Sequence, residues 1–175
     1  MNVISPLMTS PTGILKQTTY HALELFARFM HGKALDVFVA GPAYSGDLGT
    51  DRPAVSALCT ESHKWIDSSA ALVLSSPPEQ SLKLTTCVLY QQDGNILTVA
   101  IINRHAQEAF DVTLNLAGTR TAASEADIYE LHHEDLTKTN TWESQPVKIK
   151  ESREAWSGVA KLKAGSLQLI RITLV

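Results

Sequence analysis

Apolar and polar residues alternate without a break from Phe110 to Leu116. A period of two places successive side chains on opposite faces of a strand, so this segment predicts a half-buried β-strand. Two runs rich in β-branched residues, Leu84–Tyr90 and Ile96–Asn103, flank five residues that include Asp93-Gly94, and they predict a β-hairpin. Further short strands are predicted at Ile128–His132, Val147–Lys150, Val159–Leu162 and Leu167–Leu174.

A helical period occurs near the N-terminus. Apolar side chains at Tyr20, Leu23, Phe26 and Met30 follow the spacing of an amphipathic helix, which we place at residues 17–31. Gly32 suits the position just after a helix end. The helix face that carries those four side chains is expected to pack partly on a sheet and to leave an exposed apolar patch.

The segment before this helix predicts an incomplete structure. Residues 2–9 read as the end of a strand, and residues 10–13 as a turn-rich loop. One strand, loop and helix cannot bury its own apolar surface, so we expect the chain to begin inside a fold. After the helix, Leu35–Val39 predicts a strand, and residues 43–82 predict a long surface excursion that can include a strand. The many short strands indicate a mainly β chain, an antiparallel sandwich or barrel.

Composition narrows the class of protein. The chain has 175 residues, 44% of them hydrophobic, and a net charge of -3. These values allow a globular core and give no basic surface for nucleic acid or an anionic membrane. No apolar run reaches the roughly 20 residues of a membrane span, and the N-terminus does not resemble a signal peptide. Cys59 and Cys87 can pair, but reduced thiols are the favoured interpretation.

Candidate chemistry is sparse. The sequence has no nucleophile elbow, phosphate-binding loop or dinucleotide fingerprint. The cluster His132-His133-Glu134-Asp135 is interpreted as a solvated strand end and turn rather than a metal site, because neighbouring strand residues point to opposite faces. A retaining glycosidase needs two carboxyl groups about 5–5.5 Å apart. Surface solvation explains all the acidic candidates considered for that pair: Glu108, Asp111, Glu125 and Asp127.

Aromatic residues and one amide complete the candidates. Trp65, Trp142 and Trp156 are far apart in the sequence, so core or rim packing is favoured over a sugar-stacking platform. Gln17 lies between a loop and a helix, where a β/α barrel builds its sites, and its amide has the donors and the acceptor that suit sugar hydroxyls. An ordinary helix residue is the alternative for Gln17.

Several motifs resemble the α-L-arabinofuranosidases of glycoside hydrolase family 51. The first set is residues 2–9 (Asn-Val-Ile-Ser-Pro-Leu-Met-Thr), Gln17-Thr18-Thr19-Tyr20 and Gly32-x-Ala34-Leu35. Later in the chain, Ile96–Arg104, His133-x-Asp135-Leu136 with Asn140-Thr141, and Leu167–Leu174 are also similar. The resemblance covers nearly the whole chain except residues 43–82.

The resemblance implies a (β/α)8 barrel followed by a jelly-roll β-sandwich. Residues 1–34 would then be the end of barrel strand eight with the last barrel helix, and residues 35–175 the sandwich. Family members remove terminal α-L-arabinofuranosyl groups with retention, through two glutamates on upstream barrel strands that have no counterpart here. Gln17 matches the glutamine that hydrogen-bonds the arabinose, and Asn2 would lie near the same pocket. No cofactor, no metal and no catalytic residue of this chain is implied.

We therefore expect the C-terminal part of a retaining arabinofuranosidase, inert by itself. Its expected partners are the missing barrel domain, an arabinose-containing oligo- or polysaccharide and, through self-association, a homo-oligomer. A non-catalytic carbohydrate-binding module and a structural or assembly domain are the alternatives. The lack of an Asn-x-Ser/Thr sequon favours a cytoplasmic location, with secretion left open by the missing N-terminus.

Overall fold

The computed structural model describes residues 5–31, 96–114 and 122–175 in full, and between them mainly the backbone of strands. The helix is α1 (Thr18–Phe29), preceded by β1 (Leu7–Ser10) and β2 (Gly13–Lys16). The next strands are β3 (Lys33–Ala34), β4 (Phe38–Ala40), β5 (Ala43–Gly46), β6 (Gly49–Pro53), β7 (Val55–Glu61), β8 (Ala71–Leu72) and β9 (Leu82–Cys87). The last are β10 (Ile96–Asn103), β11 (Phe110–Leu114), β12 (Ala122–Leu131), β13 (Ile149–Ala155), β14 (Val159–Leu162) and β15 (Ser166–Leu174).

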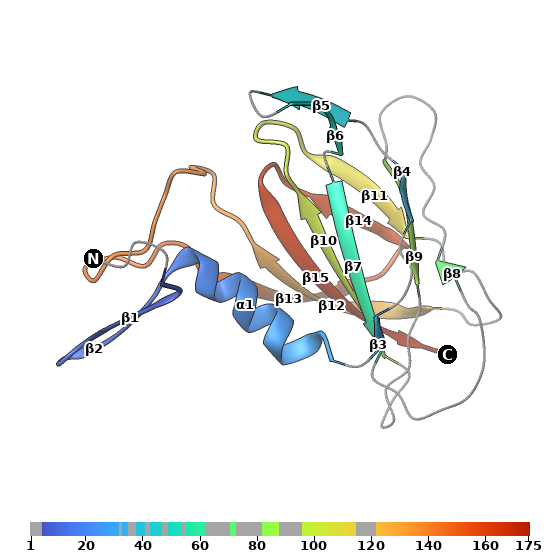
Figure 1. Cartoon of the computed structure of the whole chain (residues 1–175). Coiled ribbons are helices and arrows are strands. Elements are labelled where there is room, and N and C mark those ends of the chain that lie inside the picture. The colour runs from blue at the N-terminus through green and yellow to red at the C-terminus, as the bar shows by residue number, and fades with distance from the viewer. Residues whose placement is uncertain are drawn as a thin grey trace.

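Two sheets form the body of the molecule (Figure 1). The six-stranded sheet has the order β13-β12-β15-β10-β7-β3, and the five-stranded sheet has the order β14-β11-β9-β4 with β8 beside β9. The described pairs are antiparallel except β9 with β11, which is parallel. The predicted mainly β fold, an antiparallel sandwich preceded by a loop and one helix, is confirmed.

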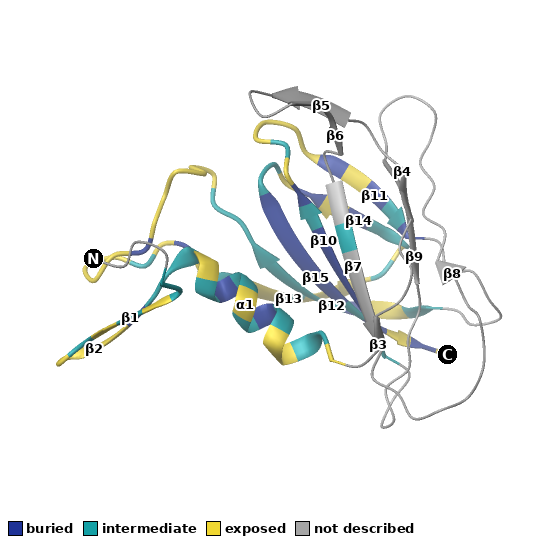
Figure 2. Cartoon of the chain, in the orientation of Figure 1, coloured by how far each residue is buried: buried dark blue, intermediate teal, exposed yellow. Residues whose placement is uncertain are grey.

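The core explains why β10 and β15 are buried over most of their length. On β15, Ile170, Ile172 and Leu174 join the cluster between the two sheets, which also takes in Val112 and Leu162 of the five-stranded sheet. The alternate residues Leu167 and Leu169 point to the other face and contact Leu25 of α1. Both faces of these central strands are therefore covered, one by the second sheet and one by the helix (Figure 2).

The predicted helix and the partial packing of its apolar face are both observed, but the centre of the contact lies elsewhere. α1 lies along the six-stranded sheet (Figure 1), with His21 and Leu25 buried at a spacing of four. Leu23 is exposed, while Phe26 and Met30 are partly buried against the cluster around Leu25, so the predicted face packs in part and leaves an exposed apolar side chain, as expected. The most deeply buried apolar side chain of the helix is Leu25, which lay outside the predicted set and is selected by tertiary contact rather than by the average apolar direction of the helix.

The turn-rich loop predicted before the helix contains a strand pair. β1 and β2 form an antiparallel hairpin in the register Leu7 with Lys16 and Ser10 with Gly13. Ser10 and Thr12 hydrogen-bond each other across the turn. The hairpin projects from the body (Figure 1), and Ile14 is exposed on it. The prediction for Asn2 falls on residues 1–4, outside the described residues.

Two further predictions concern strand pairing. The expected hairpin of 84–90 with 96–103 is wrong, because β9 lies in the five-stranded sheet and β10 lies between β15 and β7 in the other sheet. The segment 43–82, expected as a surface excursion that could include a strand, holds four described strands, β5 to β8, and β7 pairs with β10 over six residue pairs from Thr60 to Val55. Local turn residues favour a hairpin, but pairing between distant segments determines the sheet to which β9, β10 and β7 belong.

Gly165, in the turn before β15, supplies a test of the packing. Its φ is +56°, and a methyl group added there would lie 2.5 Å from Leu136 Cδ2. Gly165→Ala is expected to lower the free energy of unfolding by about 1–2 kcal/mol, because a Cβ disfavours the left-handed conformation. Gly13→Ala is the matched control, since a methyl group there meets nothing within 4 Å. Equal unfolding midpoints in urea for both variants would contradict the expectation.

Candidate functional site

Gln17 lies at the junction between β2 and α1, as the residue that precedes the first helical turn. Its backbone is extended, with φ −70° and ψ 164°, and its side chain makes no capping hydrogen bond to the helix. The side-chain Nε2 donates to Met8 Sδ at 3.0 Å. Sulfur is a weak acceptor, and this bond uses no acceptor capacity of the amide oxygen. The side chain therefore keeps a donor and an acceptor for a polar ligand.

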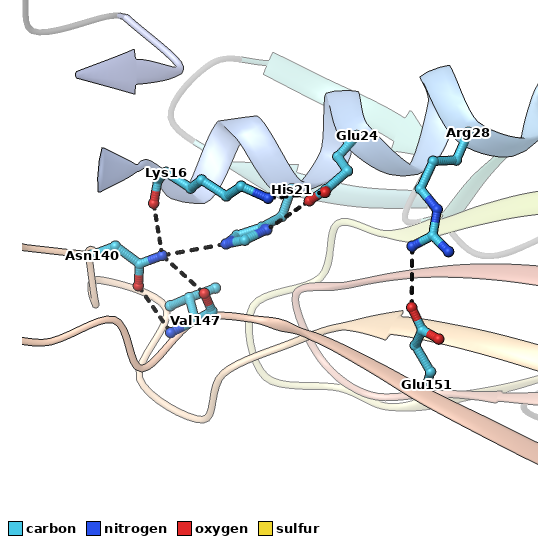
Figure 3. Close-up of polar contacts among 7 residues, drawn as sticks. All are labelled: Lys16, His21, Glu24, Arg28, Asn140, Val147 and Glu151. Atoms are coloured by element: carbon cyan, nitrogen blue, oxygen red, sulfur yellow. Dashed lines mark hydrogen bonds and ion pairs between the residues drawn. The ribbon is translucent and has the colours of Figure 1, made fainter. Parts of the chain in front are cut away.

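The peptide that joins Lys16 to Gln17 is held on both sides. Its N–H, which belongs to Gln17, donates to the carbonyl oxygen of Pro6 at 2.9 Å. Its carbonyl oxygen, which belongs to Lys16, accepts from Asn140 Nδ2 at 3.0 Å (Figure 3). Asn140 is 3% exposed and comes from the loop between β12 and β13, more than a hundred residues further along the chain.

Asn140 also binds the backbone of Val147 in both directions. Its Nδ2 donates to the Val147 carbonyl oxygen at 2.9 Å, and its Oδ1 accepts from the Val147 N–H at 3.0 Å. The two N–H groups of one amide are thus directed to two carbonyl oxygens, and the amide oxygen has its own donor. A buried Asn with its hydrogen-bonding groups used in this way is a stable connector between segments.

Charged groups lie beside this connector. Glu24 accepts from Lys16 Nζ at 3.0 Å through Oε1 and contacts His21 Nδ1 at 3.3 Å through Oε2 (Figure 3). Burial alone raises the pKa of the Glu24 carboxyl, but the hydrogen bonds from Lys16 and His21 outweigh it, and the pKa lies below its ordinary value. The hydrogen bond to Glu24 correspondingly raises the pKa of Lys16.

This ion pair predicts a pH dependence. A carboxyl whose pKa is lower in the folded state stabilises the protein above its unfolded pKa, and that stabilisation is lost as the pH falls through the folded value. Glu24→Gln should therefore cost about 0.5–1 kcal/mol at pH 7, a modest value because the Lys16 side chain is 41% exposed. The difference from the parent chain should shrink as the pH falls below the ordinary glutamate value of about 4.3 and be lost once the pH passes below the lowered folded pKa. Chemical unfolding at pH 7 and pH 3 measures it, and a difference that stays constant would refute the expectation.

A hollow of about 390 Å³ opens beneath α1. Ala22 and Phe26 of the helix, Ile102, and Leu167 give it mainly apolar walls, and the segment 131–138 closes one side. The predicted strand end and turn at 132–135 are confirmed, because β12 ends at Leu131 and the Asp135 N–H donates to His133 Nδ1. Hydrogen bonds from the Thr137 side chain and N–H lower the pKa of Asp135.

The acidic candidates are surface groups in the structure. Arg153 Nη2 lies 2.8 Å from Glu125 Oε2, and Arg153 Nε lies 3.9 Å from Asp127 Oδ1. Glu108 and Asp111 are exposed on the loop before β11 and on β11 itself. An arginine beside two solvent-accessible carboxylates forms an ordinary surface ion pair and partly offsets their charge. Among the described residues, no group of three or more His, Cys, Asp or Glu is placed to hold a metal ion.

The described tryptophans are not neighbours in one surface. Trp156 packs against the core and lines a second hollow of about 310 Å³ at the end of the sandwich, as predicted. Trp142 is exposed in the loop between β12 and β13, so core or rim packing is wrong for it. Trp65 and the side chains of Cys59 and Cys87 are outside the described residues. In the part of the chain that the structure describes, no helix is long and apolar enough to cross a membrane.

Sequence reasoning missed the part that Asn140 plays in this site. Asn140-Thr141 stood out in the sequence only as a pair similar to the family. The signal that identifies it is burial of a polar side chain against backbone groups of two distant segments, which only the folded chain shows.

Comparison with known proteins adds independent information. Residues 1–167 match the family model described as the alpha-L-arabinofuranosidase C-terminal domain. A protein of Aspergillus flavus named "Probable alpha-L-arabinofuranosidase C" is 29% identical over 98% of this chain and 28% of its own length. A protein of the same name from Aspergillus clavatus is 30% identical over the same shares. The chain thus spans less than a third of the length of these relatives.

Solved structures show the same fold. A family 51 α-L-arabinofuranosidase from Bifidobacterium longum superposes with a TM-score of 0.71 at 22% identity, over 98% of this chain and 29% of that one. The α-L-arabinofuranosidase of Thermotoga maritima, solved as an arabinose complex, superposes with a TM-score of 0.61 at 15% identity, over 98% of this chain and 32% of that one.

Proposed function

Because the chain belongs to the α-L-arabinofuranosidase C-terminal domain family, we propose that it acts as the C-terminal part of a retaining α-L-arabinofuranosidase. The substrates would be arabinan, arabinoxylan and arabino-oligosaccharides, from which the enzyme releases terminal non-reducing α-L-arabinofuranosyl residues. The family match over residues 1–167 carries this proposal.

In this proposal the residues divide by role. Residues 1–34 complete the catalytic barrel, and residues 35–175 form the sandwich that supports it. A retaining glycosidase needs an acid/base carboxyl and a nucleophilic carboxylate, which upstream barrel strands would supply. The acidic residues described above are solvated or paired with Arg153, which agrees with a chain that takes no acid/base role.

Gln17 is proposed to hydrogen-bond the bound arabinose. Its side chain makes one hydrogen bond, to the Met8 sulfur, and does not cap α1. An amide in this condition can donate to one sugar hydroxyl oxygen and accept from another hydroxyl group. Gln17 lies in neither of the two hollows described above, which supports a pocket completed by upstream residues.

The proposed partner surface lies on the side of the hairpin and helix away from the sandwich. Ile14 on β2, Leu23 on α1 and Leu7 on β1 are exposed. Figure 2 shows exposed segments on all three of these elements. Apolar side chains that gather outside the core mark contact surfaces in many proteins. The upstream barrel is the occupant that this proposal requires, and a homo-oligomer would use whatever surface the barrel leaves.

Hydrolysis of an aryl α-L-arabinofuranoside tests the proposal. The 175-residue chain should show no turnover above buffer, whereas a longer protein carrying the upstream region should hydrolyse the substrate. In that longer protein Gln17→Ala should lower kcat/KM about 10-fold, the effect of one lost hydrogen bond. Gln107→Ala, an exposed amide in another loop, is the matched control. Turnover by the repurified short chain would refute the proposed division of roles.

A further inference from the structure

We propose that Asn140 is a positioning residue for Gln17, which it acts on by fixing the Lys16–Gln17 peptide to the sandwich. This inference rests on the proposed role of Gln17. It concerns a residue that never touches the sugar in this scheme and that lies in the loop between β12 and β13. The sandwich would thereby fix the direction in which the Gln17 side chain points from the backbone.

The first step is the restraint on the peptide plane. The Gln17 N–H is bound by Pro6 O at 2.9 Å, and the opposite edge of the same peptide is bound by Asn140 Nδ2 at 3.0 Å. A planar peptide held at both edges cannot rotate about its flanking bonds without breaking a hydrogen bond. The Cα–Cβ direction of Gln17 is therefore fixed relative to both the hairpin and the sandwich.

The second step is the anchoring of Asn140 itself. Its two bonds with Val147 resemble a pair of ladder bonds between strands, so the amide plane is fixed before it reaches Lys16 (Figure 3). Val147 is buried at 6% exposure and leads into β13. The path from the sheet to Gln17 consists of groups that are buried or hydrogen-bonded throughout.

The third step explains why the residue is asparagine. The site needs one acceptor for the Val147 N–H and two donors for two carbonyl oxygens, which a primary amide supplies. Aspartate keeps the acceptor and loses both donors, and alanine loses all three groups. His21 Nε2 lies 3.5 Å from Asn140 Nδ2, and a bare nitrogen there suits the amide hydrogens if the His21 proton is on Nδ1 toward Glu24.

Amide hydrogen exchange on the 175-residue chain tests this without substrate. Asn140→Asp should reduce the protection of the Gln17 N–H at least 10-fold relative to the Leu169 N–H of β15. It should change the protection of the Val147 N–H, again relative to the Leu169 N–H, less than about threefold, because Oδ1 still accepts from that group. Asn140→Ala should reduce both. Glu143→Gln, an exposed change in the same loop, is the matched control and should alter neither.

The outcomes separate this inference from the proposed function. Unchanged relative protection of Gln17 in Asn140→Asp, or an equal fall at Gln17, Val147 and Leu169, would overturn the positioning role. Unfolding of both variants would also overturn it, since Asn140 would then act on global stability. Exchange involves no sugar, so failure of Gln17→Ala to affect hydrolysis would refute the role of Gln17 in binding while leaving the exchange result as it stands.

Discussion

Leu25→Ala is expected to lower the free energy of unfolding by about 2–5 kcal/mol. Leu25 is fully buried at the centre of α1 and contacts Leu167, Leu169 and Ala100 on the outer face of the six-stranded sheet. Its removal leaves a cavity between helix and sheet that neither rigid element can close. Urea unfolding followed by circular dichroism measures the effect.

The matched control lies on the same helix. Leu23→Ala has the same chemical change two residues earlier, but Leu23 is 56% exposed, so we expect a change of less than about 0.5 kcal/mol. Equal losses for the two variants would mean that α1 is not docked on the sheet through Leu25. The pair therefore also tests whether Leu25, which the sequence did not single out, is the main contact of the helix.

The helix illustrates what the sequence pattern can and cannot predict. The period of 3.6 predicted a helix at 17–31, and α1 covers Thr18–Phe29. The side of the helix that packs depends on which apolar side chain meets β10 and β15, and the helix sequence alone does not contain that information. The alternating strand at 110–116 was easier to predict, because a period of two directly indicates which residues are buried. In β11, Phe110, Val112 and Leu114 are buried as the alternation predicts.

Strand pairing was harder to predict than strand existence. β12, β13, β14 and β15 each overlap a predicted strand, yet β9 and β10 lie in different sheets although their turn residues favour a hairpin. Strand partners in a sandwich are determined by packing in the shared core, between segments far apart in the sequence, and local turn residues carry no information about such pairing. β7 escaped prediction as a sheet strand for the same reason.

The candidate site divides in the same way. The position of Gln17 between a turn-rich segment and a helix could be read from residue order, and the family resemblance singled it out. The hydrogen bond from Asn140 that holds the peptide before Gln17 could not be predicted from the sequence, because Asn140 and Lys16 are brought together only by docking of α1 on the sheet. Polar connectors of this kind have no period and no local motif.

Asn103→Asp is expected to destabilise the sandwich strongly. Asn103 is 1% exposed at the end of β10, and its Nδ2 donates to the carbonyl oxygens of Glu108 at 2.7 Å and Lys163 at 2.9 Å. Its Oδ1 accepts from the His105 N–H at 2.9 Å. A carboxylate would place a negative oxygen against two carbonyl oxygens, so we expect a loss of about 3–5 kcal/mol at pH 7.

The loss should depend on pH with a defined sign. Burial and the two carbonyl oxygens disfavour the charged form, so the pKa of the introduced carboxyl is raised in the folded state. Stability is then retained below the unfolded value, near pH 3.9, and is lost as the pH rises through the folded value. Asn103→Ala is the control, because it removes the same donors without adding a charge. Its cost of about 1–3 kcal/mol should be independent of pH.

Unfolding of both variants at pH 4 and pH 7, each compared with the parent chain, decides the matter. We expect the free energy of unfolding of Asn103→Asp to be close to that of Asn103→Ala at pH 4 and well below it at pH 7. If the two variants keep the same difference at both pH values, the introduced carboxylate has found solvent or a cation. The loops that carry Glu108 and Lys163 would then be less firmly held by Asn103 than their hydrogen bonds indicate.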